Sequence, residues 1–245
     1  MAQTTETGQF NGDKKHGQSI LHRWERPFID ANVSRFPSWI MGHHLTMVTL
    51  FWSMAIVGFG WLAQDNPRWL FAMSLVVFGQ WFTDSFDGSL GKYRKQGLIK
   101  WGFFMDHFLD LIFAGAIVIA YSLIAPAGMD LWFNFLLLAT TVMMGLSFLS
   151  FAATNQFQIA FLGIGPTEVR IGYIAINTVL FFTGTELFSW AVPLALIGHV
   201  VAIAFIAWRT QAVLWDVDQK ANIDGPQFWG HAADGSSTQS NDLVG

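Results

Sequence analysis

Two neighbouring stretches decide the fold of this chain: D-S-F-D-G-S-L-G-K at residues 84–92 and G-F-F-M-D-H-F-L-D at residues 102–110. Both lie in or beside long apolar segments, and together they contain four aspartates. Carboxylates in or beside hydrocarbon are costly, so they are rare there unless they are paired, metal-bound or functional. The aspartates are spaced i,i+3 in the first stretch and i,i+4 in the second, which places each pair on one face of a helix.

Two such faces turned toward each other form a compact group of oxygen ligands, the environment that a hard divalent cation prefers. Four carboxylates at close range cannot all stay ionised without cations. We therefore predict a site for one or two divalent ions, Mg2+ or Mn2+. We favour two ions, an arrangement that would suit phosphoryl transfer. The predicted metal ligands are Asp84, Asp87, Asp106 and Asp110. Of these, Asp110 is expected to lie deepest in the bilayer, so it is the candidate base for an attacking hydroxyl.

The composition places the chain among membrane proteins. Its 245 residues are 53% hydrophobic and 12% charged, whereas soluble domains carry about 25% charged residues. The formal net charge of −4 gives no indication of nucleic-acid binding. The absence of cysteine excludes disulfides and thiol chemistry, and one domain is the default at this length.

Six segments contain the roughly 20 apolar residues that a helix needs to cross a bilayer. We predict an all-α integral membrane protein with six transmembrane helices, the last two separated by a tight turn near Trp190. The predicted spans are about 44–64, 69–90, 102–124, 131–153, 169–189 and 191–213. With six spans, both termini share one side of the membrane with every Lys and Arg except Arg68. The positive-inside rule then places the termini and the acidic site in the cytoplasm.

The segments outside the spans divide into a helix and two tails. Apolar residues recur at helical spacing between 20 and 29, which predicts an amphipathic interfacial helix at 19–43, before a catalytic domain at 44–213. An irregular linker is the alternative to this helix. Residues 1–18 lack the apolar core of a signal peptide and are predicted to be disordered. Residues 214–245 are predicted to form a cytoplasmic tail, an arrangement compatible with a bacterial inner membrane.

Glycines accompany the acids. Gly88 and Gly91 remove side chains one turn apart, so that a bulky group can approach the backbone there. Gly102 does the same at the start of the next span. The positive charge of Lys92 would attract phosphates.

These residues resemble a known signature. The pattern D-x-x-D-G-x-x-A-R, followed after eight or nine residues by G-x-x-x-D-x-x-x-D, is similar to that of the CDP-alcohol phosphotransferases, and it covers residues 84–110 here. All four acids and the obligatory Gly88 and Gly102 are present. Gly91 stands where the family has Ala, and Lys92 stands where it has Arg. Lys keeps the charge but lacks the bidentate fork that suits a phosphate.

The resemblance implies an activity. The protein would transfer a substituted phosphate from a CDP-linked alcohol to a hydroxyl acceptor in the membrane, with release of CMP, in phospholipid synthesis. The implied metal ligands are Asp84, Asp87, Asp106 and Asp110, the last serving also as base. The implied contacts to the cytidine diphosphate are Gly88, Gly91 and Lys92. A homodimer is implied in the same way.

Two features favour the choline and ethanolamine branch of this family. The D-H-x-x-D at residues 106–110 is similar to the motif of those enzymes, and G-P-T-E-V-R at residues 165–170 resembles a T-E-V stretch before one of their late spans. The favoured donor is therefore CDP-ethanolamine or CDP-choline, with a diacylglycerol-like acceptor. The alternative is CDP-diacylglycerol as donor with a small polar alcohol as acceptor.

Three further residues are candidates for the site. Glu168 and Arg170 are predicted to lie on the cytoplasmic side, where the carboxylate could attract a cationic head group. The alternatives are that Glu168 caps a helix and that Arg170 is a positive-inside anchor. His107 is a candidate second proton carrier, or it hydrogen-bonds a neighbour.

Two functions of other classes remain as alternatives. The acids could form the ion pathway of a transporter, although they all lie at one end of their spans and no charged relay runs through the last three spans. The departure at Lys92 raises the second alternative, a catalytically inactive membrane scaffold.

Overall fold

The fold is a bundle of long helices. The computed structural model describes residues 15–16, 21–154, 157–158 and 165–224. The tail predicted at 1–18, apart from residues 15–16, and residues 225–245 of the tail predicted at 214–245 lie outside the described residues. Within these residues the helices are α1 (His22–Asn32), α2 (Gly42–Ala63), α3 (Trp69–Tyr93), α4 (Ile99–Leu123), α5 (Asp130–Thr154), α6 (Pro166–Thr183) and α7 (Phe188–Asp224). Two short 3-10 helices, η1 (Val33–Arg35) and η2 (Thr185–Leu187), and the paired strands β1 (Lys15–His16) and β2 (Phe157–Gln158) complete it.

Four parts of the described chain are long and apolar enough to cross a membrane: α2, α4, α5 and the segment Thr185–Lys220, which contains most of α7. This confirms the prediction of a helical integral membrane protein. The other two predicted spans correspond to α3, which carries Asp84 and Asp87, and α6, which carries Glu168 and Arg170. The count of six spans therefore stays a prediction.

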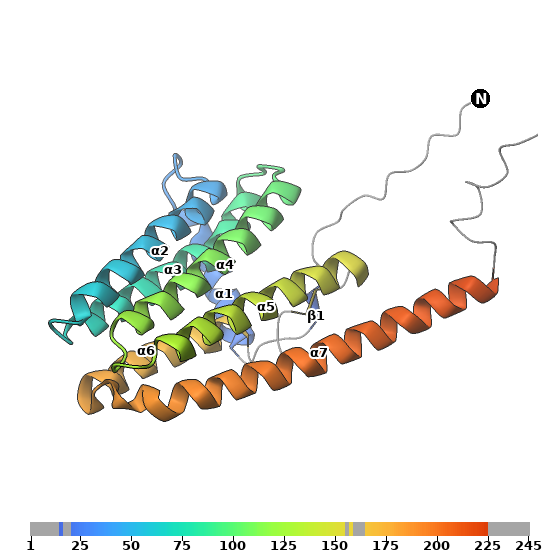
Figure 1. The fold of residues 1–245 in the computed structure, drawn as a ribbon. Helices are drawn as coiled ribbons and strands as arrows, with labels where there is room; N and C mark the ends of the chain where they lie inside the picture. The colour runs from blue at the N-terminus through green and yellow to red at the C-terminus, as the bar shows by residue number, and fades with distance from the viewer. Residues whose placement is uncertain (1–14, 17–20, 155–156, 159–164, 225–245) are drawn as a thin grey trace, which may run out of the picture.

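The helices are arranged around α2 and α3. Both α3 and α4 pack against α2, α6 packs against α3, and α5 packs against α4. Figure 1 shows α7 running along α5 and extending beyond its end. The connection between α3 and α4 is short, and α2 packs closely against both helices. Helices α2 and α4 can approach closely because Gly60 has no side chain. A methyl group at this position would collide with Ala120.

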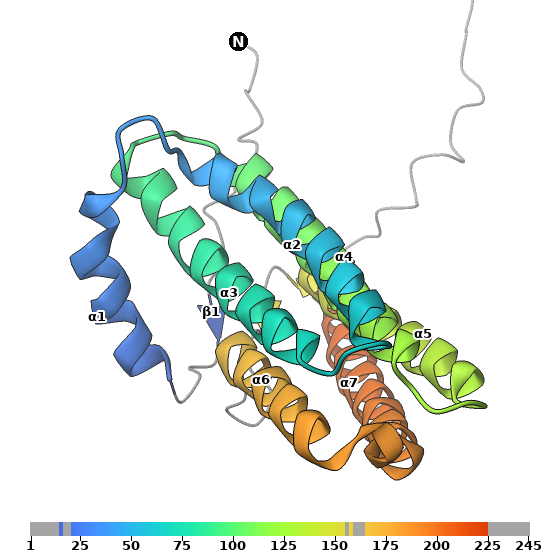
Figure 2. The same cartoon turned by 90° about the vertical axis from the view of Figure 1, so that its left-hand side faces the viewer.

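Two apolar clusters hold this arrangement. The larger one joins α2, α3, α4 and α6 through fully buried side chains such as Ile56, Met73 and Leu180. The smaller one packs α1 and η1 onto α2 and α3, with Ile29 and Phe86 at its centre. Figure 2 shows α1 lying beside α3. The amphipathic helix is thereby fixed next to the helix that carries the first pair of acids.

The amphipathic helix is shorter than the segment predicted for it. It ends at Asn32, not near residue 43, and η1 follows it. Phe36 adopts an extended backbone, with φ −65° and ψ 137°, directly before Pro37. A residue before proline is pushed out of the helical region by steric conflict with the proline ring. This explains why helical structure stops after η1 and does not continue to residue 43.

The last two helices also differ from the prediction. The turn lies at Gly184, not near Trp190, and Gly184 has a φ of +81° that suits glycine and ends α6. Helix α7 begins at Phe188 and continues to Asp224, past the predicted boundary at residue 213. It ends directly before a Gly-Pro pair in the sequence, which is a strong stop signal.

Candidate active site

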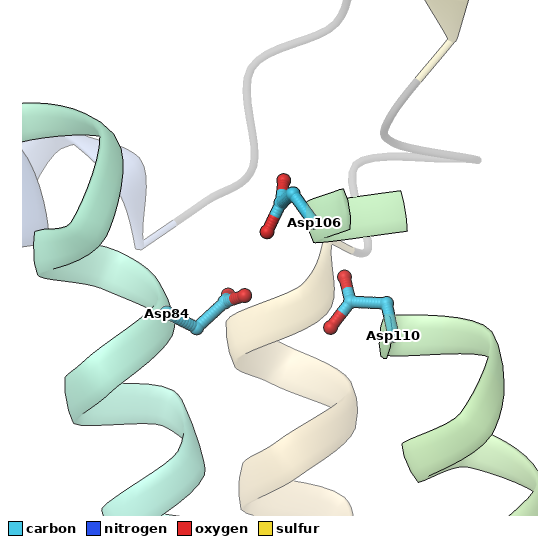
Figure 3. Close-up of side chains that lie close together, drawn as sticks. All are labelled: Asp84, Asp106 and Asp110. Carbon is cyan, nitrogen blue, oxygen red and sulfur yellow. The ribbon is translucent and has the colours of Figure 1, made fainter. Parts of the chain in front are cut away.

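Three of the four predicted acids converge in the structure. Asp84 comes from α3, while Asp106 and Asp110 lie one turn apart on α4. One carboxylate oxygen of each lies within 4.8 Å of the others, and Figure 3 shows the three side chains pointing toward one another. The side chains retain 19%, 38% and 33% exposure for Asp84, Asp106 and Asp110. The group is therefore sheltered but still reachable by a ligand.

Arg170 provides positive charge to this group. It lies near the start of α6, its side chain is 10% exposed, and its Nη2 atom is 2.9 Å from Oδ2 of Asp84 and 3.7 Å from Oδ1 of Asp110. The guanidinium thus links α3 and α4 from a third helix. Neither role considered from the sequence, a head-group contact or an anchor at the membrane surface, anticipated these ion pairs.

The fourth predicted ligand, Asp87, is not part of the group of three. Its Oδ2 atom accepts a hydrogen bond of 2.6 Å from the hydroxyl of Thr46 on α2, and its Oδ1 atom accepts one from the backbone N–H of Gly88. Metal binding by Asp87 stays a prediction. Thr46 was not identified from the sequence, because a single threonine in an apolar helix is an ordinary residue.

The glycines of the signature differ in how much space surrounds them. A methyl group at Gly88 or Gly102 would meet open space, and at Gly91 it would only touch the side chain of Gln96. The tight position is Gly42, at the start of α2. A methyl group there would collide with the carbonyl oxygen of Asp87 and lie 2.9 Å from the backbone nitrogen of Gly91. The open glycines are consistent with an approaching ligand, and Gly42 lets α2 pack against the signature.

The basic residues after α3 have different surroundings. Lys92 is exposed, so it is accessible to a phosphate. Arg94 instead donates hydrogen bonds of 2.9 and 3.1 Å to the carbonyl oxygens of Phe36 and Pro37. It holds the segment between α1 and α2 against the end of α3.

The two remaining candidates, Glu168 and His107, make the contacts expected of their alternative roles, a helix cap and a hydrogen bond to a neighbour. Glu168 accepts hydrogen bonds of 2.9 Å from the backbone N–H groups of Gly165 and Leu21, so it caps α6 and ties it to the start of α1. Nδ1 of His107 lies 2.7 Å from the carbonyl oxygen of Phe103 in the preceding turn. Their predicted roles in head-group binding and proton transfer stay predictions.

Glu25 on α1 is a residue near the site that sequence analysis did not single out. Its carboxylate accepts hydrogen bonds from Trp81 and Ser85 on α3, at 2.9 and 2.8 Å. It also accepts one of 3.1 Å from Thr167 on α6. These bonds fasten α1 to both helices beside the acidic group. The sequence showed an acid on an amphipathic helix but not its partners.

The chemistry of the donors fits a divalent metal. The group offers oxygen atoms alone, from three carboxylates on two helices, and their spacing allows one ion to contact all three. Asp84, Asp106 and Asp110 are therefore the residues that would hold it. Bound there, a divalent ion would polarise phosphate oxygens and neutralise charge that develops during transfer.

Fold and site together define a helical membrane protein with a candidate divalent-metal centre near one end of its helices. The model of the family described as CDP-alcohol phosphatidyltransferase matches residues 39–212, which is more than half of the chain and includes all four acids. The protein belongs to the CDP-alcohol phosphatidyltransferase family. A search of curated proteins found no match.

Membership in this family gives the reaction class. The protein is a transferase of substituted phosphate groups that uses a CDP-alcohol in lipid synthesis, and divalent metals are typical of the family. The predictions of an enzyme and of its family are confirmed. Because the family consists of transferases, the alternatives of an ion transporter and of an inactive scaffold are disfavoured.

Proposed function

We propose that the protein transfers a phospho-amino alcohol from CDP-ethanolamine or CDP-choline to a diacylglycerol-like lipid, releasing CMP. The convergence of Asp84, Asp106 and Asp110 within a membrane protein of this family is the observation that supports catalysis. Support for the choice of donor comes from the D-H-x-x-D and T-E-V motifs in the sequence. Head-group recognition by Glu168 is proposed from the sequence motif, and both oxygens of this residue accept backbone hydrogen bonds.

The proposed reaction needs one base. Asp110 takes the proton of the acceptor hydroxyl as the oxygen of that hydroxyl forms a bond to phosphorus. The bond from this phosphorus to the bridging oxygen of the diphosphate breaks, and its electron pair leaves with CMP. A side-chain exposure of 33% leaves Asp110 open to an acceptor. The open backbone at Gly88 and the exposed Lys92 support a nucleotide site beside the acids, with Gly91 and a second metal ion, bound with Asp87, as further parts of it.

The proposal includes a setting for the enzyme. The distribution of Lys and Arg supports six spans with both termini and the acidic site in the cytoplasm. A bacterial inner membrane and a homodimer are also part of the proposal. In this setting the nucleotide arrives from the cytoplasm and the lipid acceptor from the bilayer.

A second donor is favoured by one observation. The family is described by phosphatidyl transfer, which fits CDP-diacylglycerol as donor and a small polar alcohol as acceptor. The acidic site would perform the same chemistry in either case, because the diphosphate of the donor is common to both.

Release of CMP by the purified protein in detergent with Mg2+ tests both donors. One arm contains CDP-ethanolamine or CDP-choline with diacylglycerol, and the other contains CDP-diacylglycerol with a panel of small alcohols. Release in the first arm alone supports the proposal, and release in the second arm alone moves the protein to the other branch. Asp110→Asn should abolish release in the active arm, and full activity of this variant would contradict the proposed base.

A further inference from the structure

Gln80 is a buried amide directed at the proposed base. It lies on α3 one turn before Asp84, on the same helix face, and is fully buried at 0% exposure. Its Nε2 atom lies 3.3 Å from Oδ1 of Asp110 on α4, to which it donates a hydrogen bond. Gln80 thus reaches from one acid-bearing helix to the other.

The other end of the same amide is unsatisfied. Oε1 of Gln80 is buried and has no hydrogen-bond partner among the residues that the structure describes. Burying an acceptor without a donor costs free energy, and an apolar side chain of similar length would avoid this cost within an apolar helix. A buried residue with an unsatisfied acceptor next to reactive groups is therefore a candidate for a functional role.

A second buried amide in the same bundle shows the contrasting case. Asn177 on α6 is 1% exposed, and both ends of its amide are used. Its Nδ2 atom donates to Oγ of Ser74 at 3.0 Å, and its Oδ1 atom accepts from the hydroxyl of Tyr121 at 2.9 Å. An amide that only holds helices together is expected to be satisfied in this way. Gln80 uses one end only, and that end contacts a carboxylate of the candidate site.

The contacts of Asp110 divide its two oxygens. Gln80 donates to Oδ1, and Nη2 of Arg170 lies 3.7 Å from the same atom. Oδ2 accepts no hydrogen bond from the described part of the protein. Two groups from different helices therefore fix one oxygen, and the orientation of the other follows from the planar carboxylate.

We propose that Gln80 is a positioning residue for Asp110: its amide holds Oδ1 so that Oδ2 is presented to the acceptor hydroxyl and the metal. This inference rests on the proposed function, in which Asp110 is the base. Loss of a group that orients a metal-bound or catalytic side chain typically lowers activity or metal affinity by about 10- to 100-fold.

The test compares Gln80→Met with the matched variant Asn177→Leu, each of which replaces a buried amide by an apolar side chain. For Gln80→Met we expect kcat for CMP release to fall roughly 10- to 100-fold, KM for the CDP-alcohol to change little, and the melting temperature in detergent not to fall. For Asn177→Leu we expect a lower melting temperature with kcat nearly unchanged. Unchanged kcat in Gln80→Met, or a loss of kcat that occurs only with a loss of melting temperature, overturns the proposal.

A second variant tests the proposal if Gln80→Met fails to fold. Gln80→Asn retains the amide but withdraws it by one methylene, so that its donor no longer reaches Asp110. It should reproduce the loss of kcat without a large change in volume. Activity equal to that of the wild type in Gln80→Asn would also overturn the proposal.

Binding of Mn2+, followed by electron paramagnetic resonance, separates this inference from the proposed function. If the wild type releases CMP and Asp110→Asn does not, the proposed function is supported. The kinetics of Gln80→Met then decide whether Gln80 positions Asp110. If the wild type releases no CMP from any donor, the proposed function fails, and Mn2+ affinity decides for Gln80 instead. An affinity about 10-fold weaker in folded Gln80→Met supports positioning, and an affinity equal to that of the wild type overturns it.

Discussion

Helices α3, α4 and α6 meet in two polar groups that differ in charge and in completeness. Toward one end, Asp84, Asp106, Asp110 and Arg170 come together from these three helices. Further along the same helices, Ser74, Tyr121 and Asn177 do the same. Arg170 and Asn177 are seven residues apart on α6, which is about 10 Å along a helix. We call the first group the acidic site and the second the neutral clasp.

The neutral clasp is complete within the protein. The hydroxyl of Tyr121 donates to Asn177, Asn177 donates to Ser74, and Ser74 donates to the carbonyl oxygen of Leu70 at 3.2 Å. The acidic site brings three carboxylates together, and the ion pairs of Asp84 and Asp110 are both made with the single guanidinium of Arg170. The neutral clasp therefore holds helices together, whereas the acidic site has an excess of negative charge that a cation can compensate.

The largest expected effect separates the two groups by activity. Asp84→Asn should lower the rate of CMP release by about 1000-fold. The substitution weakens the proposed metal site, and with it the electrostatic stabilisation that a metal ion would give the transferring phosphate. Ser74→Ala, a change in the neutral clasp on the same helix, should leave the rate within about threefold of the wild type, since Ser74 touches no group of the acidic site. Initial rates of both purified variants, measured with the active donor, make this comparison. Equal losses in the two variants would mean that the groups are not functionally distinct.

Arg170→Met tests the charge balance of the acidic site. In EDTA the variant should be destabilised by about 3 kcal/mol, because removing one partner leaves sheltered carboxylates without compensation. Saturating Mg2+ should reverse much of this loss, since ions that bind only the folded protein stabilise it. Thermal unfolding in detergent, with EDTA and with Mg2+, measures the difference. A loss that is the same in both conditions would argue against a cation site at the three acids.

Gly42→Ala tests how the acidic site is supported by α2. The added methyl group collides with backbone atoms of Asp87 and Gly91, which cannot move aside as a side chain could. We expect a loss of about 2 kcal/mol in stability, together with lower activity. Gly88→Ala is the matched control, because its methyl group enters open space; it should retain stability while weakening nucleotide binding. Similar melting temperatures for the two variants would contradict the packing argument.

The smallest expected effect belongs to the neutral clasp. Asn177→Leu should lower stability by about 1 kcal/mol, in the range measured for hydrogen bonds between membrane helices. The effect is limited because Tyr121 keeps an acceptor in the carbonyl oxygen of Tyr173, and Ser74 keeps one in that of Leu70. The loss should be the same with EDTA and with Mg2+. A dependence on Mg2+ would show that the clasp and the acidic site are coupled.

Part of the candidate site could be predicted from sequence because it is local. The i,i+4 spacing of Asp106 and Asp110 places them on one face of α4 whatever surrounds that helix, and a signature of acids and glycines identifies the family. The structure brings Asp84 to the same place. Arg170 was also a candidate from the sequence, but its pairing with Asp84, 86 residues away, was not predicted. Gln80 was not identified at all, because its partner Asp110 lies 30 residues away on another helix.

The boundaries of the helices show the same division. The signals that end η1 and α6 are local: a residue before proline at Phe36 and a glycine with positive φ at Gly184. Hydropathy averaged over a span concealed them. The short connection between α3 and α4 favours antiparallel neighbours whose acids can meet, and the acids do converge. It does not determine which other helix packs against both of them. Here α2 holds both.

Four properties follow from the sequence alone: the class of the protein, its helical character, the identity of its acids and its family. These depend on composition and on spacing along one helix, which the periodicity of the backbone translates directly into position. Three contacts became known from the folded structure: Arg170 pairs with Asp84, Asp87 accepts a hydrogen bond from Thr46, and Gln80 donates one to Asp110. These contacts depend on how separate helices pack, and the same apolar segments are compatible with several packings until their side chains interlock.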